Sequence, residues 1–267
     1  MTLRRFLTTL AVGGLCLALV ACGPKNAITT SHTPFQLGDV TVDVVVHEAA
    51  SPGLTYFNLH DDENTSVRAA LDVIGEHGGR VIELKHSGDR RISFRLGDST
   101  YEFDPNRMFT DMGRAATLER FGGVNDAALA AVRTFADAVL QKVNPTQLHV
   151  IVTLHNTQAS YTVYAYTGEG DYANEAELVH TAEEMDPNDF FFVIDRELYD
   201  QLRQMEQNVV LQDNLRVADD GSLSVWSAQQ GVGYVNVEAQ HGHRRAQARM
   251  LLRLHELLYA EGEAVEP

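Results

Sequence analysis

The sequence predicts a single α/β domain built on a mixed, largely parallel central sheet. Two strand-like runs, at 54–59 and 80–86, flank a segment with helical spacing, which is the pattern of a β-α-β unit. Such a unit implies parallel strand pairs joined by a crossover helix. No repeat, low-complexity tract or proline-rich linker divides residues 37–267, so one domain accounts for them.

Residues 1–21 have the character of a bacterial export signal. Two arginines precede an apolar run that is short for a bilayer span and that ends in Leu19-Val20-Ala21-Cys22. This ending resembles the lipobox of bacterial lipoproteins. The resemblance implies cleavage before Cys22, lipid attachment to that cysteine, and a polar spacer over residues 22–36. Gly23 after the cysteine favours the outer membrane, with the domain facing the periplasm.

The charge and cysteine content exclude several kinds of partner and cross-link. The chain carries 37 acidic and 21 basic residues, and removal of the two signal arginines leaves 19 basic residues and a net charge of −18. Such a surface repels nucleic acid and gains nothing from anionic headgroups, so lipid alone would hold the protein at the membrane. Cys16 lies in the signal and Cys22 would carry lipid, so no disulfide forms within one mature chain. The oligomeric state stays open.

The first elements follow from β-branched runs and their turn residues. Residues 40–47 are rich in valine and predict a strand, and Ser51-Pro52-Gly53 turns the chain into the strand at 54–59. Thr65 or Ser66 is suited to cap the helix that follows, and Gly78-Gly79 to end it before the strand at 80–86. His60 therefore stands at the carboxyl end of a strand, where open α/β sheets commonly bind ligands.

The middle of the chain predicts a hairpin, a helix and a very apolar strand. Alternation at 91–96 and 100–103 indicates the hairpin, and residues 124–143 have helical spacing up to Asn144-Pro145. The apolar run at 147–154 predicts a strand that ends in His155.

The last third predicts further strands and helices around an acidic segment. We expect a strand at 157–167 and an acidic segment at 168–189. We interpret this segment as a solvated insertion, in preference to a rim that attracts cationic substrate groups. The other expected elements are strands at 190–194 and 209–211, a helix at 197–207, a strand at 232–237 that leads to Glu238, and an amphipathic closing helix at 244–261.

The stretch His60-Asp61-Asp62-Glu63 is a candidate for metal binding. A histidine at a strand end and a glutamate three residues later can place two ligands on the same side of one ion. Asp61 or Asp62 is the alternative carboxylate ligand, less favoured by its spacing. A solvated loop is the simpler interpretation of these four residues taken alone.

Further chemistry-bearing residues follow in a distinctive order. They are Asp104-Pro105-Asn106-Arg107, His155 and Glu238. Together with His60 and Glu63, this order resembles the zinc carboxypeptidase family, the carboxypeptidase A-like metallopeptidases. The resemblance lies in motifs scattered over residues 40–240 and implies a three-layer sandwich with helices on both faces of the sheet.

The resemblance also implies a role for each matched residue. His60, Glu63 and His155 would bind Zn²⁺, and Asp104 would accept the other ring hydrogen of His60. Asn106 and Arg107 would bind the terminal carboxylate of the substrate, because a planar guanidinium can donate two hydrogen bonds to one carboxylate. Glu238 would be the general base.

Three features of the family have no secure match. A second substrate-binding arginine must come from Arg90, Arg91 or Arg95; no motif chooses among them, and we take Arg91 as the candidate. Tyr234 is a weak candidate for the tyrosine over the substrate. His241 and His243 could line a cleft, although the start of a helix explains them more simply.

These observations favour an envelope zinc hydrolase of the carboxypeptidase type, which would cleave an amide bond next to a free carboxylate. Peptidoglycan stem peptides or scavenged peptides are suitable substrates by location. An N-acyl amino acid deacylase of the same superfamily is one alternative. A lipoprotein that binds peptide or metal without turnover is the other.

Overall fold

The structure is a computed structural model that describes residues 26–148, 150–158 and 160–263. The predicted signal, Cys22 and the first residues of the predicted spacer lie outside these ranges. Strand β1, Ile28–Leu37, pairs along its whole length with β2, Val40–Ala49. The prediction of a spacer up to residue 36 is therefore wrong from residue 28 onward. The strand escapes a hydrophobicity pattern because it is mostly exposed and polar, and Pro34 is tolerated at a sheet edge.

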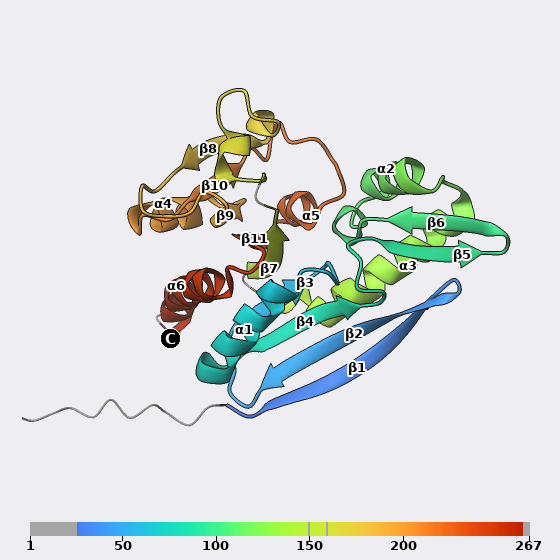
Figure 1. Ribbon diagram of the computed structural model, residues 1–267, viewed down its shortest axis with the longest axis horizontal. Coiled ribbons are helices and arrows are strands. Elements are labelled where there is room, and N and C mark those ends of the chain that lie inside the picture. Colours follow the sequence, from blue (N-terminus) through green and yellow to red (C-terminus); the bar gives the residue numbers. More distant parts are fainter. Residues whose placement is uncertain (1–25, 149, 159, 264–267) are drawn as a thin grey trace, which may run out of the picture.

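A nine-stranded mixed sheet forms the middle of the described structure (Figure 1), in the order β1-β2-β4-β3-β7-β11-β9-β10-β8. The four central strands run parallel to one another. They are β4 (Arg80–Lys85), β3 (Thr55–Asn58), β7 (Val150–Thr157) and β11 (Gly233–Gln240). Antiparallel pairs join β2 to β4, β9 to β11 and β8 to β10. The predicted class, a mixed and largely parallel sheet, is confirmed.

Three short strands form the end of the sheet opposite β1. These are β9 (Phe190–Val193), β10 (Val209–Gln212) and β8 (Ala176–His180). A separate hairpin, as predicted from the alternation, joins β5 (Ile92–Leu96) to β6 (Ser99–Phe103).

The sheet is buried on both faces, as its apolar central strands require. Neighbouring residues of one strand point to opposite faces, so Tyr56 and Phe57 of β3, both fully buried, belong to two different apolar clusters. Helices α1, α4 and α6 contribute Val67, Leu198 and Leu251 to the cluster that contains Tyr56. Helices α2, α3 and α5 and the β5–β6 hairpin pack into the cluster that contains Phe57, on the other face of the sheet. The fold is thus a three-layer arrangement with helices on both faces.

Six α-helices cover the sheet in the described residues. They are α1 (Asn64–His77), α2 (Asp111–Phe121), α3 (Asp126–Val143), α4 (Arg196–Gln204), α5 (Leu223–Gln230) and α6 (Arg244–Glu263). Helices α1 and α6 lie side by side (Figure 1). Short 3₁₀ turns occur at Pro105–Arg107, Pro145–Gln147, Val163–Tyr166 and Ala173–Glu175. Within the described part of the chain, none of the helices is long and apolar enough to cross a bilayer.

The local predictions hold for most elements, but three of them fail and two helices were not predicted. Glu63 precedes α1 in place of the predicted cap Thr65 or Ser66, which lie inside the helix. The expected strand at 157–167 is wrong: a loop and the 3₁₀ turn Val163–Tyr166 take its place. The expected solvated insertion at 168–189 contains the sheet strand β8. Helices α2 and α5 had no prediction.

Candidate metal centre and active-site cavity

His60 and Glu63 belong to a tight turn between β3 and α1. The Glu63 N–H donates to the His60 carbonyl oxygen (3.2 Å), and the Ser66 N–H donates to the Glu63 carbonyl oxygen (3.2 Å). This turn brings the two side chains together, with Nδ1 of His60 3.0 Å from Oε1 of Glu63. Both side chains are completely buried. The three-residue spacing in the sequence therefore gives one pair of ligand atoms.

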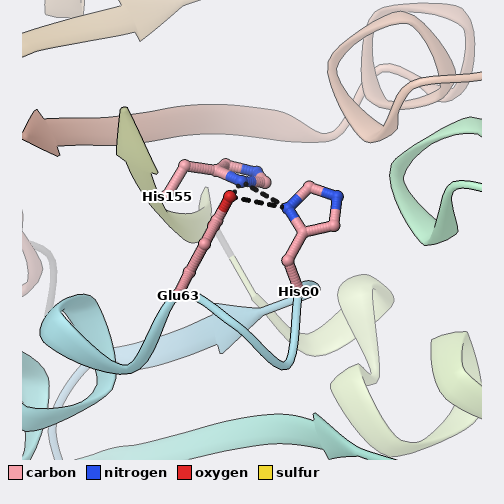
Figure 2. Close-up of side chains that lie close together, drawn as sticks. All are labelled: His60, Glu63 and His155. Atoms are coloured by element: carbon pink, nitrogen blue, oxygen red, sulfur yellow. Dashed lines mark hydrogen bonds and ion pairs between the residues drawn. The ribbon is translucent and has the colours of Figure 1, made fainter. Parts of the chain in front are cut away.

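His155 joins this pair from the neighbouring strand. It lies in β7, which is paired in parallel with β3, and β7 continues two residues beyond it to Thr157. The Nδ1 atom of His155 is 3.1 Å from Nδ1 of His60 and 2.9 Å from Oε2 of Glu63. Figure 2 shows the three side chains converging from the β3–α1 turn and β7. In the described residues, this is the one group of three or more potential ligand side chains close enough to hold one ion.

Asp104 fixes the orientation of the His60 ring from the far side. The Nε2 atom of His60 is 2.8 Å from Oδ1 of Asp104, so the Nε2–H donates to the carboxylate and leaves the lone pair of Nδ1 directed at the cluster. The Asn106 N–H donates to the same Asp104 oxygen (2.8 Å), which holds the carboxylate at the start of its 3₁₀ turn. This is the position expected for a residue that supports a metal ligand.

The electrostatics of the cluster favour a cation. Burial lowers the pKa of His60, but the charges and hydrogen bonds of Glu63 and Asp104 outweigh it and raise that pKa to about 9. Burial likewise opposes ionisation of Glu63, yet the positive charges of His60 and His155 hold its pKa well below the ordinary value. The cluster therefore stabilises positive charge between its members.

A divalent ion fits this donor set. Two Nδ1 atoms 3.1 Å apart can share one proton at most, whereas one ion can accept a lone pair from each of them. Two imidazole nitrogens and one carboxylate are a combination that Zn²⁺ accepts, with a coordination position left for a further ligand. We conclude that His60, Glu63 and His155 can hold a metal ion.

The neighbouring aspartates have other contacts. Oδ2 of Asp61 accepts hydrogen bonds from the N–H groups of His86 (2.7 Å) and Gly88 (2.8 Å), and Asp61 also pairs with Lys85. It therefore ties two loops together and does not belong to the cluster. Asp62 lines the adjoining cavity without joining the cluster. Glu63 is thus the carboxylate of the group, in agreement with the spacing argument.

Glu238 lies beside His155 in the sheet. The two residues are directly paired between β11 and β7, and β11 extends past Glu238 to Gln240. Glu238 is only 8% exposed, and its Oε1 accepts a hydrogen bond from the Asn236 side-chain amide (3.0 Å). Burial raises the pKa of Glu238, and the charge of Glu63 adds to that increase. The carboxylate is therefore a stronger base than an exposed glutamate.

A cavity of about 440 Å³ opens beside these groups. The metal-cluster residues Glu63 and His155 and the carboxylate of Glu238 line it, and so do Asn106 and Arg107. The structure therefore brings together every matched residue of the resemblance, with Asp104 directly behind His60.

The two predicted carboxylate-binding residues already have partners within the chain. Arg107 Nε is 3.1 Å from Oδ2 of Asp220, and its Nη1 donates to the Asn106 carbonyl oxygen (2.7 Å). The side-chain oxygen of Asn106 accepts the N–H of Leu223 (3.0 Å). Arg107 is 40% exposed and faces the cavity, so a substrate carboxylate can reach it in competition with Asp220.

Arg91 is not a cavity residue, which corrects our choice among the three arginines. It pairs with Glu102 across the hairpin and lies over the ring of Phe121, 4.5 Å from its centroid. Arg90, which precedes β5, lines the cavity instead; it pairs with Glu63, and its Nε lies 3.6 Å from Oδ2 of Asp104. The pairing of Arg91 within the hairpin follows from strand alternation, whereas the direction of Arg90 depends on the loop before it.

Tyr234 and His241 line the cavity, whereas His243 lies just before α6. Tyr234 is buried in the cavity wall, where its hydroxyl accepts a hydrogen bond from Thr153 (2.8 Å). His241 lines the cavity. His243 contacts Asp189 (3.0 Å) just before α6, as the helix-start interpretation suggested.

The sequence reasoning missed the opposite wall of the cavity. Its members come from the loops and strand ends between residues 160 and 222 and carry no motif. They are Tyr161, Tyr166, Tyr172, Glu175, Gln212 and Asp220. The available signals were the density of tyrosines at 161–172 and the acidic segment at 168–189, which contains Glu175 and whose less favoured interpretation was a rim for cationic substrate groups.

Comparisons with known proteins find likeness in structure only. No family model matches the chain, and no curated protein matches it. Among solved structures, the murein-tripeptide amidase MpaA from Escherichia coli aligns over 83% of this chain and 91% of its own, with 15% identity and a TM-score of 0.42. The tripeptide-bound cell shape determinant Csd4 from Helicobacter pylori aligns over 86% of this chain and 56% of its own, with 12% identity and a TM-score of 0.41.

A third similar structure is an aspartoacylase family protein from Mesorhizobium loti. It aligns over 81% of this chain and 62% of its own, with 14% identity and a TM-score of 0.36. All three are likenesses of fold at low sequence identity.

Proposed function

We propose that this protein is a zinc-dependent hydrolase of the carboxypeptidase type, which cleaves an amide bond next to a free carboxylate. One observation carries the proposal: two imidazole Nδ1 atoms and a carboxylate converge at the wall of a cavity that also contains the buried base Glu238. When bound, Zn²⁺ would supply Lewis-acid chemistry, which polarises a carbonyl and makes water more acidic.

The residues of the chain divide the remaining work among them. Glu238, with its raised pKa, takes the proton of the attacking water and delivers it to the leaving amine. Arg107 binds the substrate's carboxylate, with Asp220 released from the guanidinium as it does so. Arg90 would donate to the scissile carbonyl oxygen; this role is supported by its position in the cavity lining and by its ion pair with Glu63.

The test uses two variants of protein that lacks residues 1–21. Wild-type protein should contain about one zinc per chain and release free amino acids from peptides. His60→Ala should lose both metal and activity. Glu238→Gln should keep the metal and lose activity by a factor of about 10² to 10⁴.

Each alternative function predicts a different outcome of this test. Full metal occupancy in His60→Ala would remove the assignment. A protein that only binds peptide would keep its affinity in Glu238→Gln and would show no turnover in the wild type. Release of acids from N-acyl amino acids, with peptides left intact, would identify the deacylase.

We also propose that Cys22 anchors the protein to the outer membrane by lipid. The lipobox-like ending Leu19-Val20-Ala21-Cys22 supports this proposal, and the start of β1 at Ile28 leaves only residues 23–27 as the connection. Labelled fatty acid should be incorporated into the full chain expressed in bacteria. Cys22→Ser should abolish incorporation and Cys16→Ser should not; label retained in Cys22→Ser would contradict the anchor.

A further inference from the structure

The wall of the cavity opposite the metal cluster contains two residues, Glu175 and Gln212, that the mechanism above does not use. Gln212, at the end of β10, is paired in the sheet with Ala176, the residue after Glu175. The Asp213 N–H donates to the Glu175 carbonyl oxygen (2.8 Å). These backbone contacts place Glu175 and Gln212 on successive positions of two adjoining segments, and both residues line the cavity.

Gln212 presents an acceptor that has no partner. Its side chain is 1% exposed, and no hydrogen bond to Oε1 is formed by the described residues. The direction of the amide is fixed by its neighbours: the Asn214 amide nitrogen donates to the Ile194 carbonyl oxygen (2.9 Å), so Oδ1 of Asn214 must accept from Nε2 of Gln212 (2.9 Å). The oxygen of Gln212 is therefore the free atom, and a buried acceptor of this kind favours a ligand that donates.

Other groups of the cavity repeat this pattern. Asn236 donates through its amide nitrogen to Glu238, and its buried Oδ1 has no partner among the described residues. Glu175 is half-buried and has no ion pair in the described structure; burial and the charge of Asp220 raise its pKa, although the charge of Arg107 reaches it and opposes that increase. Both arginines that line the cavity are already paired, Arg90 with Glu63 and Arg107 with Asp220. The cavity lining thus contains two buried amide oxygens without a partner in the described residues, and the carboxylate of Glu175.

Aromatic rings surround the same region. The rings of Tyr166 and Tyr172 are 5.6 Å apart between centroids, and those of Tyr166 and Phe192 are 5.4 Å apart. Tyr172 is joined to Glu175 through the Glu175 N–H, which donates to the Tyr172 carbonyl oxygen (2.9 Å). Aromatic faces attract cations and also pack against an aliphatic chain.

An ammonium group complements all these features, because it offers three donors and no acceptor and carries a positive charge. We propose that Glu175 and Gln212 form a subsite for an ammonium group on the side chain of the residue that carries the substrate's free carboxylate. The inference rests on the proposed function, since Arg107 in the same cavity would hold that carboxylate. Lysine is the simplest residue of this chemical class. A neutral side chain would leave the acceptors unpaired, and an acidic one would be repelled.

The test compares two substrates that differ only at the terminal residue, lysine or its neutral counterpart norleucine. Metal-loaded protein should cleave the lysine substrate with a kcat/KM at least about tenfold higher, which corresponds to one charge-assisted hydrogen bond. Glu175→Gln should reduce the ratio to about one, and Glu175→Lys should favour a glutamate-terminal substrate. Glu177→Gln is the matched control, because Glu177 lies only two residues further on, in β8, is paired with Arg196 and does not line the cavity.

A binding measurement separates failure of the subsite from failure of the proposed function. Calorimetry with free lysine and free norleucine needs no turnover. Tighter binding of lysine that is lost in Glu175→Gln and kept in Glu177→Gln would support the subsite even if no substrate were cleaved. Equal binding of the two amino acids, or a lysine preference that survives Glu175→Gln, would overturn it.

Discussion

The two ends of the cavity are built on opposite principles. At the metal end, His60, Glu63, His155 and Asp104 are buried or nearly so and contact one another directly, on the ends of neighbouring strands and the turns beside them. At the far end, Glu175 and Asp220 are only partly buried and lie on loops and edge elements, and Gln212 keeps an unpaired oxygen. The sheet thus fixes the positions of the metal-cluster side chains, and in the proposed function the preference for substrate would come from the surrounding loops and strand ends.

The largest effect is expected at the metal end. His155→Ala removes one of three ligands, so metal affinity should fall by a factor of at least about 10³, with loss of all activity. His241→Ala is the matched control, because His241 lines the same cavity outside the cluster. Metal content measured after dialysis distinguishes the two variants. Equal zinc in both would mean that the ion is bound elsewhere.

A smaller loss of metal affinity is expected for Asp104, which contacts the ligand His60 and is not itself a ligand. Asp104→Ala leaves the three ligands in place but frees the Nε2–H of His60, so metal affinity should fall by a factor of about 10 to 100. Competition with a chelator measures the loss. Asp111→Ala, at an exposed aspartate paired with arginines, should leave the affinity unchanged. An Asp104→Ala protein with wild-type affinity would show that the His60 ring is oriented by packing alone.

The pH dependence tests the base. Glu238 must be ionised to accept a proton, and burial raises its pKa, so kcat/KM should fall on acidification at a pH above the ordinary range of glutamate. The Asn236 hydrogen bond lowers that pKa, so Asn236→Ala should move the acid limb to higher pH. Asn214→Ala, which removes a contact to Gln212, should leave the limb where it is. A limb that does not move in Asn236→Ala would argue against Glu238 as the titrating group.

The free energy of unfolding should show the smallest difference between variants at the metal end and variants at the far end of the cavity. Asp61→Ala removes a buried carboxylate that accepts hydrogen bonds from two backbone N–H groups, so the free energy of unfolding should fall by about 1–3 kcal/mol. Asp220→Asn removes a partly exposed ion pair, which is worth less than about 1 kcal/mol. Urea unfolding of both variants measures the difference. A larger loss in Asp220→Asn would mean that the far wall is as rigid as the metal end.

The sequence predicted the metal end because its residues follow strong local patterns. The apolar runs before His60 and His155 identified two strands, and parallel strands bring their carboxyl ends to one edge of the sheet. The resemblance then supplied Glu238 and Asp104. Nothing in a single sequence states that Glu238 and His155 are register partners, because that pairing joins strands far apart in the chain.

The parts of the structure that were not predicted lack such a strong local pattern. Helix α2 buries Arg114 and Thr117, and α5 buries Ser224 and Ser227, so neither has a clear apolar face. Strand β1 is held by backbone pairing with little side-chain burial. The far wall is assembled from loops, whose direction no periodicity predicts.

Anomalous X-ray diffraction at the zinc edge, on crystals grown with zinc, tests the central claim most directly. The account predicts one strong peak within about 2.0–2.2 Å of Nδ1 of His60, Nδ1 of His155 and a carboxylate oxygen of Glu63. A peak coordinated by other residues, or no peak between these three side chains at full zinc loading, would contradict it.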